Sequence, residues 1–151
     1  MAPVLAIAAP TFGRLVEVLT AEKRSLRLLY DHLIRLGLLL AAGEHRFIAR
    51  SLDEVAAIRA DLGALELARA AICDTLVPSS NATLMDAVAF APDDLAMRLL
   101  SVGDDLQVLS NLITQEQERC QEISRRRESL TRTAIRRIAE WNPDPDEPSA
   151  A

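Results

Sequence analysis

Aromatic residues are scarce in this sequence, which has one tryptophan, one tyrosine and three phenylalanines among 151 residues. Few flat rings are therefore available to stack on nucleobases or planar cofactors. The sequence also lacks a glycine-rich phosphate loop, a CxxC or Cys/His cluster typical of zinc, and the Glu-x-x-His pair of di-iron bundles. No arrangement of reactive groups indicates catalysis. We therefore expect a protein that is not an enzyme and that needs no cofactor or metal.

Excess positive charge and long uncharged apolar runs are also missing. The net charge of −5 gives no general attraction to nucleic acid. No segment reaches membrane-spanning length without charges, and the apolar N-terminal decapeptide lacks the basic residues that open a signal peptide. We therefore expect a cytoplasmic protein without membrane insertion and without nucleic acid as a partner.

The two cysteines, Cys73 and Cys120, lie far apart in sequence and within helical patterns. Buried reduced thiols are the favoured interpretation, and a disulfide joining two helices is the alternative.

What the chain does have is aliphatic residues at helical spacing. The longest such run predicts one helix from Pro92 to Trp141, because Asp93 and Asp94 favour a helix N-terminus and the next proline is Pro143. Steps of three and four residues are typical of a coiled-coil seam or a long bundle helix. The stripe consists of Leu95, Leu99, Val102, Leu106, Leu109, Ile113, Cys120, Ile123, Leu130, Ala134 and Trp141, and Glu116, Arg127 and Arg137 interrupt its second half.

Two further long helices precede this one. The first is predicted from Thr11, as a possible N-cap, to Ala42, with Gly43 ending it and Glu22 alone intruding on its leucine register. We interpret Glu22 as a solvated or paired residue of the seam. The second helix is predicted over residues 52–76, opened by a Ser51–Glu54 capping box, with Arg69 where Leu or Ile would be expected.

The predicted fold is all-α, an elongated antiparallel helical bundle or coiled coil of three long helices plus a short helix over residues 84–90. That short helix is expected to close one end of the bundle with Met85, Val88 and Phe90. A single domain, 11–141, would lie between a flexible N-terminus, 1–10, and a disordered acidic proline-rich tail, 142–151.

Six arginines gather near the end of the final helix. They are Arg125, Arg126, Arg127, Arg132, Arg136 and Arg137, with Glu118, Glu122, Glu128 and Glu140 among them. A nucleic-acid contact is conceivable for such a segment, but arginines at consecutive positions point around a helix, and the nearby acids weaken the field. We interpret the segment as a solvated helix face or a protein-partner surface.

A turn and a patterned helix follow the first long helix. The turn is Ala42-Gly43-Glu44. The second long helix follows, with Ser51-Leu52-Asp53-Glu54 at its start and Leu62, Leu65-Glu66 and Arg69 further along. The short helix then contains Thr83-Leu84-Met85-Asp86, and Pro92 precedes the final helix. This order resembles FlgN-like flagellar export chaperones over residues 12–135. Members often carry asparagines in the middle of the final helix, whereas here residues 114–121 contain none and Asn111 alone is nearby. If those asparagines set partner recognition, the client here differs.

The resemblance implies binding without catalysis. FlgN-like proteins hold hook-filament junction proteins of the FlgK and FlgL type by their C-terminal regions and prevent premature assembly. On this chain we expect a client's amphipathic helix to lie between Leu109 and Leu130 of the final helix. The expected apolar anchors are Ile113, Cys120 and Ile123, and Glu116, Gln117 and Arg127 would set the register.

Self-association through the same stripe is the alternative. The chain would then be a structural coiled-coil or scaffold protein without an export client, and a homo-oligomer.

Overall fold

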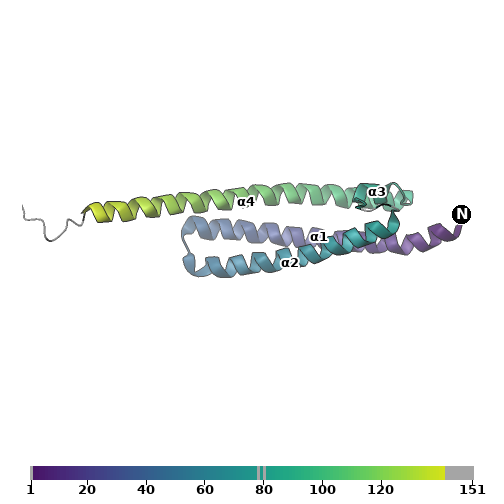
Figure 1. The fold of residues 1–151 in the computed structure, drawn as a ribbon, viewed down its shortest axis with the longest axis horizontal. Coiled ribbons are helices and arrows are strands. Elements are labelled where there is room, and N and C mark those ends of the chain that lie inside the picture. The colour runs from purple at the N-terminus through teal and green to yellow at the C-terminus, as the bar shows by residue number, and fades with distance from the viewer. Residues whose placement is uncertain (1, 78, 80, 142–151) are drawn as a thin grey trace, which may run out of the picture.

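The computed structural model describes the backbone of residues 2–77, 79 and 81–141, and the elements in these residues are helices. In chain order they are α1 (Ala2–Ala42), α2 (His45–Leu76), α3 (Leu84–Val88) and α4 (Asp93–Trp141) (Figure 1). The all-α prediction is confirmed, as is a bundle of three long helices and one short one. The predicted tail, 142–151, lies outside the described residues.

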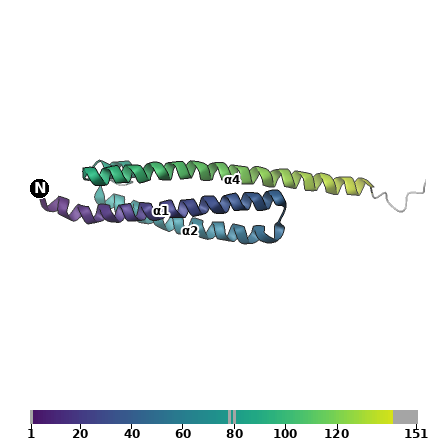
Figure 2. The same ribbon diagram turned by 180° about the vertical axis from the view of Figure 1, so that it is seen from behind.

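Helix α1 lies between α2 and α4. It packs along both of them, whereas no Cα atom of α2 comes within 8 Å of a Cα atom of α4 in the described chain. The hairpin of α1 and α2 runs beside the first part of α4, and α3 lies against the start of α4 (Figures 1 and 2). The space between α2 and α4 is therefore closed on one side by α1.

Buried side chains form two clusters along this arrangement. The α3-end cluster contains Phe12, Leu15, Leu19, Ile72, Cys73, Val77, Ala87, Leu99 and Leu106. The hairpin cluster, nearer the α1–α2 turn, contains Leu29, Leu33, Leu36, Val55, Ile58, Leu62, Ile113 and Cys120. Every long helix contributes to both clusters, so the apolar stripes expected from the sequence do meet in one elongated core.

Helix α1 begins nine residues before the predicted start. Thr11 lies inside the helix and is not its N-cap, and Pro10 is accommodated within it. A proline removes one intrahelical hydrogen bond. The alanines around it favour helix, and Ala8 packs against the α3-end cluster, which together offset that loss. At the other end Gly43 has a φ of 71°, and the Glu44 amide donates to the Leu39 carbonyl, so the predicted C-terminal glycine is confirmed.

Helix α2 begins at His45, so the predicted capping box at Ser51 is wrong. Ser51 is inside the helix and 3% exposed, and its hydroxyl oxygen has no hydrogen-bond partner among the described residues. The reason is that Ile48 already packs on the hairpin cluster, at the same three- and four-residue spacing as Ser51 and Val55. Burial of this earlier turn outweighs the local capping signal.

Helix α3 is shorter than predicted and is capped by Thr83. The Thr83 hydroxyl accepts from the Asp86 amide at 3.2 Å, and the Asp86 carboxylate accepts from the Thr83 amide at 2.8 Å. Ala87 is buried and Val88 is half-buried, but Met85 and Phe90 are exposed. The expectation that Met85 and Phe90 close the bundle end is therefore wrong.

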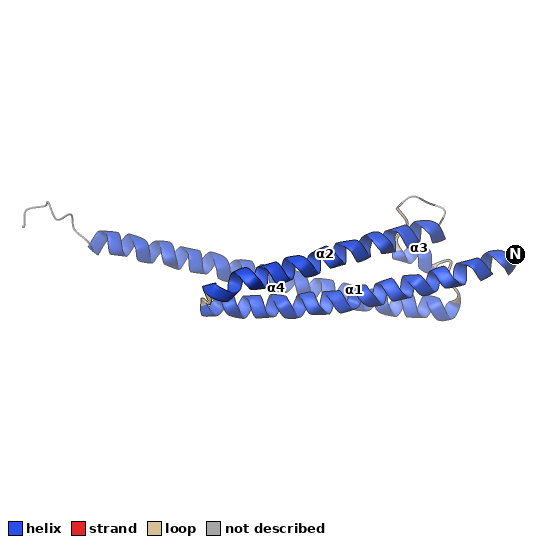
Figure 3. Cartoon of the chain, turned by 90° about the horizontal axis from the view of Figure 1, so that it is seen from below, coloured by secondary structure: helices blue, strands red, loops and turns tan. Residues whose placement is uncertain are grey.

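Helix α4 continues well past the α1–α2 turn (Figure 3). Its predicted extent to Trp141 is confirmed. The last part of α4, from Ile123 to Ile138, is named here the projecting end. Among the described residues, no helix has an apolar stretch long enough to cross a membrane.

Candidate partner-binding surface

Two of the predicted apolar anchors on α4 lie in the protein's own core. Ile113 is 6% exposed and Cys120 is 7% exposed, and both belong to the hairpin cluster. The Cys120 thiol donates to the Leu33 carbonyl of α1 at 3.4 Å. The expectation that these two side chains are free to receive a client is therefore wrong, because α1 extends far enough to cover α4 up to this level.

The predicted register residues have different surroundings. Glu116 lies 3.3 Å from the Arg119 guanidinium, one turn along α4, and Gln117 is half-buried. Arg127 reaches the C-terminal end of α1, where its guanidinium donates to the Ala41 carbonyl. Cations stabilise a helix C-terminus, so Arg127 fastens α4 to the α1–α2 turn. Whether any of the three contacts a client stays a prediction.

Beyond Arg127 the side chains of α4 are mostly exposed. Leu109 and Ile123 are half-buried, whereas Leu130 is 70% exposed. Ile135 and Ile138 are 62% and 63% exposed and were not among the predicted contact residues. Ile138 follows Ala134 by four residues and so continues the stripe, which is the signal that could have identified it.

An apolar groove lies between α2 and α4 with α1 as its floor. This bundle groove has a volume of about 430 Å³. Its lining residues are Leu33, Leu36, Leu40, Ile48, Leu52, Val55, Arg59, Gln117, Cys120, Gln121 and Ser124. The groove follows from the separation of α2 and α4, and it was not predicted because helix spacing is not visible in a sequence.

A second groove lies where the bundle ends. This end groove, also of about 430 Å³, is lined by Leu40, His45, Ser124, Arg127, Glu128, Thr131 and Arg132. Arg127, Glu128 and Arg132 bring charged groups to this groove, but most of the surface that its lining residues expose there is carbon, as in the bundle groove.

The arginines of the projecting end are partly paired with glutamates of the same helix. Arg126 lies 2.8 Å from Glu122, which holds the pKa of the Glu122 carboxyl below its usual value, and Arg132 pairs with Glu128. These are exposed pairs, which contribute little to stability. From residue 122 to residue 138 there are six arginines and two glutamates, a net charge of +4.

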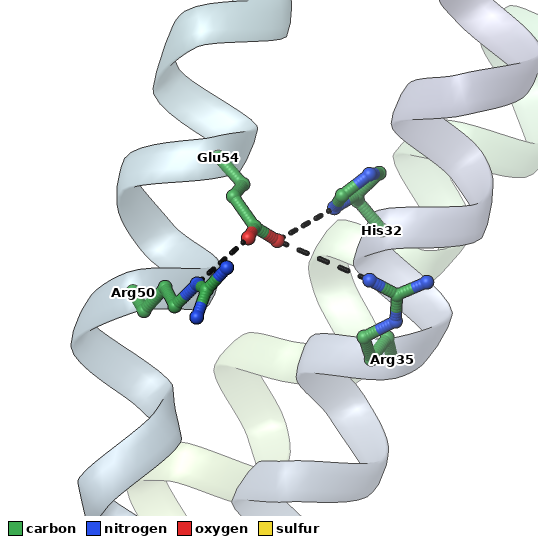
Figure 4. Close-up of polar contacts among 4 residues, drawn as sticks. All are labelled: His32, Arg35, Arg50 and Glu54. Carbon is green, nitrogen blue, oxygen red and sulfur yellow. Dashed lines mark hydrogen bonds and ion pairs between the residues drawn. The ribbon is translucent and has the colours of Figure 1, made fainter.

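Charged residues also join α1 to α2. The Glu54 carboxylate of α2 forms an ion pair with Arg50 at 3.2 Å and lies 3.3 Å from His32 and 3.9 Å from Arg35 on α1 (Figure 4). The His32 contact is an ion pair only when the imidazole is protonated. This cluster is a link between the two helices of the hairpin, in which Arg50 donates a hydrogen bond to Glu54 and His32 and Arg35 make longer contacts with it.

Both cysteines are free and buried. Burial raises the pKa of each thiol, so both stay protonated and unreactive in the folded protein. The interpretation of the cysteines as buried reduced thiols is confirmed. In the described part of the chain no group of three or more His, Cys, Asp or Glu residues is placed to hold a metal ion.

The fold and surface thus define an elongated helical bundle with an open groove and a projecting helix end. Comparisons with protein-family models, with curated proteins and with solved structures gave no match for this chain.

Proposed function

We propose that the protein is a cytoplasmic export chaperone that binds the C-terminal regions of flagellar hook-filament junction proteins of the FlgK and FlgL type. Binding keeps the client unassembled before secretion. The proposal is supported by the order of sequence features described above and by the exposed apolar side chains of the projecting end. The observation that carries it is the continuation of the α4 stripe beyond the end of α1, with Leu130 and Ile138 more than 60% exposed.

An unpartnered apolar stripe on a helix is a surface for another helix. Burial of one large aliphatic side chain stabilises a complex by about 1.5–3 kcal/mol before the entropic cost of association. A client's amphipathic helix would supply the neighbour that α1 supplies to the first half of α4. Because an isolated helix is marginally stable in water, the client would also stabilise the projecting end.

The test is co-purification of the full chain with the C-terminal regions of FlgK-like and FlgL-like proteins from the same organism, followed by mass determination. The proposal expects a stoichiometric complex whose mass is the sum of 16.5 kDa per chain and the client. Failure of both clients to bind a folded protein would contradict it. A mass that rises with concentration in the absence of a client would instead support the self-associating coiled coil.

Matched variants locate the binding surface. The double variant Leu130→Asp/Ile138→Asp should lose the client, since both substitutions place a carboxylate on the exposed stripe. The control is Leu67→Asp/Met97→Asp, at two side chains that are each 74% exposed and lie outside the projecting end. Retention of the client by the first double variant would show that the projecting end is not the site. The buried Ile113 is unsuitable for this test, because a charge there would unfold the bundle.

A further inference from the structure

The bundle groove and the end groove adjoin one another, because Leu40 and Ser124 line both of them, and the two together are named here the trough. The trough follows α4 from Gln117 to Arg132. At 1.5 Å per residue this is about 22 Å of helix, which matches a ligand helix of about 15 residues.

The two halves of the trough differ in chemistry. The bundle half is lined on its α1 and α2 sides by aliphatic residues and by Arg59. Leu52 there is 49% exposed, while Leu33 and Leu36 at the floor are 4% and 5% exposed. The end half contains Arg127, whose guanidinium also donates to the Ala41 carbonyl, and Arg132, which pairs with Glu128, so its lining carries one positive charge more than its acid neutralises. A ligand that matches the trough therefore offers apolar side chains along its length and can place acidic groups beside Arg127 and Arg132 at the end half.

Charge and shape favour a helix over two other ligands of the trough, a second copy of the chain and a membrane surface. The segment of residues 122–138 in a second copy would bring a net charge of +4 against the same +4, which is repulsive. A flat anionic bilayer could meet the arginines and the exposed Leu52, but it could not reach Leu33 and Leu36 at the floor between α2 and α4. A single narrow helix satisfies both halves.

The direction of that helix follows from its dipole. The carbonyl end of a helix carries partial negative charge, and a free C-terminal carboxylate adds a full one. Arginine side chains donate hydrogen bonds to carboxylates in two-point geometry. The C-terminal end of the ligand therefore belongs over Arg127 and Arg132, with its apolar N-terminal part in the bundle groove.

We propose that the trough formed by the bundle groove and the end groove binds an amphipathic helix of about 15 residues with an acidic C-terminal end. This inference rests on the proposed function, since it describes a segment by which a client is held beside the exposed stripe; Leu130 and Ile138 of that stripe do not line the trough. It adds a direction, a length and a charge that the proposed function does not contain.

The experiment uses three labelled 16-residue helical peptides titrated with the full chain and followed by fluorescence anisotropy. The first has an N-terminal leucine stripe, glutamates in its last two turns and a free C-terminus. The second replaces the glutamates with lysines and has an amidated C-terminus, and the third carries the glutamates in its first two turns instead. The first peptide should bind at least tenfold more tightly than either of the others and should weaken as salt is raised. Equal affinities would overturn the proposal.

Single substitutions in the chain test the contribution of each half of the trough to peptide binding. Leu52→Asp should weaken the first peptide at least tenfold, and Arg132→Glu should do the same while it strengthens the lysine peptide. The controls are Leu67→Asp on α2 and Arg98→Glu on α4, both exposed and outside the trough, and these should leave binding unchanged. Circular dichroism checks that each variant is folded. Unchanged binding in the folded Arg132→Glu variant would overturn the proposal.

Other occupants give distinct results. Sedimentation with vesicles of phosphatidylcholine and phosphatidylglycerol without peptide binding would assign the trough to a membrane surface. A concentration-dependent mass without peptide binding would assign it to a second copy. Either result overturns the proposal. If junction-protein regions bind but Leu52→Asp has no effect on them, the proposed function stands and the trough is wrong. If the first peptide binds and the junction-protein regions do not, the trough stands and the named client is wrong.

Discussion

Arg69 of α2 and Glu22 of α1 form an ion pair, with 3.2 Å between the guanidinium and the carboxylate. Each is the charged residue that interrupts the apolar stripe of its own helix, and Glu22 is only 3% exposed. One carboxylate oxygen of Glu22 has no hydrogen-bond partner among the described residues. The charge of Arg69 therefore neutralises the charge of Glu22 inside the bundle, although one oxygen of the Glu22 carboxylate stays without a hydrogen bond from the described part of the chain.

The loss of Arg69 should destabilise the fold more than the loss of both charges. Arg69→Leu leaves a buried carboxylate without its partner, and we expect the free energy of unfolding to fall by about 2–3 kcal/mol. The double variant Glu22→Leu/Arg69→Leu restores both apolar stripes, and its stability should equal or exceed that of the natural protein. Urea unfolding followed by circular dichroism measures both. A double variant less stable than the natural protein would show that the charged pair is a net stabiliser.

Glu22 should also give stability a distinct pH dependence. Burial raises the pKa of this carboxyl above its ordinary value, Arg69 opposes that shift and Glu66 adds to it. A raised pKa means that the folded protein binds the proton more tightly than the unfolded chain does. The contribution of Glu22 to stability therefore falls as pH rises from the unfolded value of about 4.5 through the folded pKa.

The variant Glu22→Gln isolates this effect from the other carboxyls. Asp105, for example, has the opposite sign, because hydrogen bonding from Lys23 lowers its pKa and its contribution is lost as pH falls. Relative to the natural protein, Glu22→Gln should gain stability as pH is raised from 4 to 7. A difference between the two proteins that stays constant over this range would contradict the raised pKa.

The thiols of Cys73 and Cys120 should react only when the protein opens. Both are buried, with raised pKa values, and each lies in a different cluster of the core. We expect Ellman's reagent to label both within seconds in urea and neither on that timescale in native buffer. Fast labelling of one thiol in native buffer would show that its half of the bundle opens locally.

Gly43 and Arg127 should be energetically coupled. Gly43 has a φ of 71°, and a Cβ atom added there would meet the Arg127 guanidinium. Gly43→Ala is therefore expected to lower stability by about 1–2 kcal/mol from the backbone alone, with a further loss from displacement of Arg127. In the Arg127→Ala variant, the further loss of stability from displacement of Arg127 should disappear, and only the backbone loss should remain. Equal effects of Gly43→Ala in both backgrounds, measured by thermal unfolding, would show that the guanidinium moves aside freely.

The sequence predicts the helices of this protein better than it predicts their contacts. The long stripe of α4 and the glycine stop of α1 are local patterns, and the structure confirms both. The capping box at Ser51 is also a local pattern, and it failed because packing of Ile48 on the hairpin cluster extends α2 by two turns. Tertiary packing overrides a local end signal when the preceding turn has an apolar side chain to bury.

The candidate site was predicted only in part for a related reason. Which residues of α4 are buried depends on where α1 ends relative to α4, and the sequence of neither helix contains that alignment. Ile113 and Cys120 therefore became core residues, whereas Leu130 remained exposed. Glu22 and Arg69 were each identified as exceptions, but their pairing requires the register between α1 and α2. The trough depends on the spacing of α2 and α4, which is set by the whole bundle.

The most direct test of the account is hydrogen–deuterium exchange along α4 with and without a junction-protein C-terminal region. Without a client, amides of residues 124–138 should exchange much faster than those of residues 99–120, because the projecting end lacks a packed neighbour. A client should slow exchange in residues 124–138 at least tenfold. Unchanged exchange in that segment in the presence of saturating client would contradict the account, as would client-free protection that grows with protein concentration.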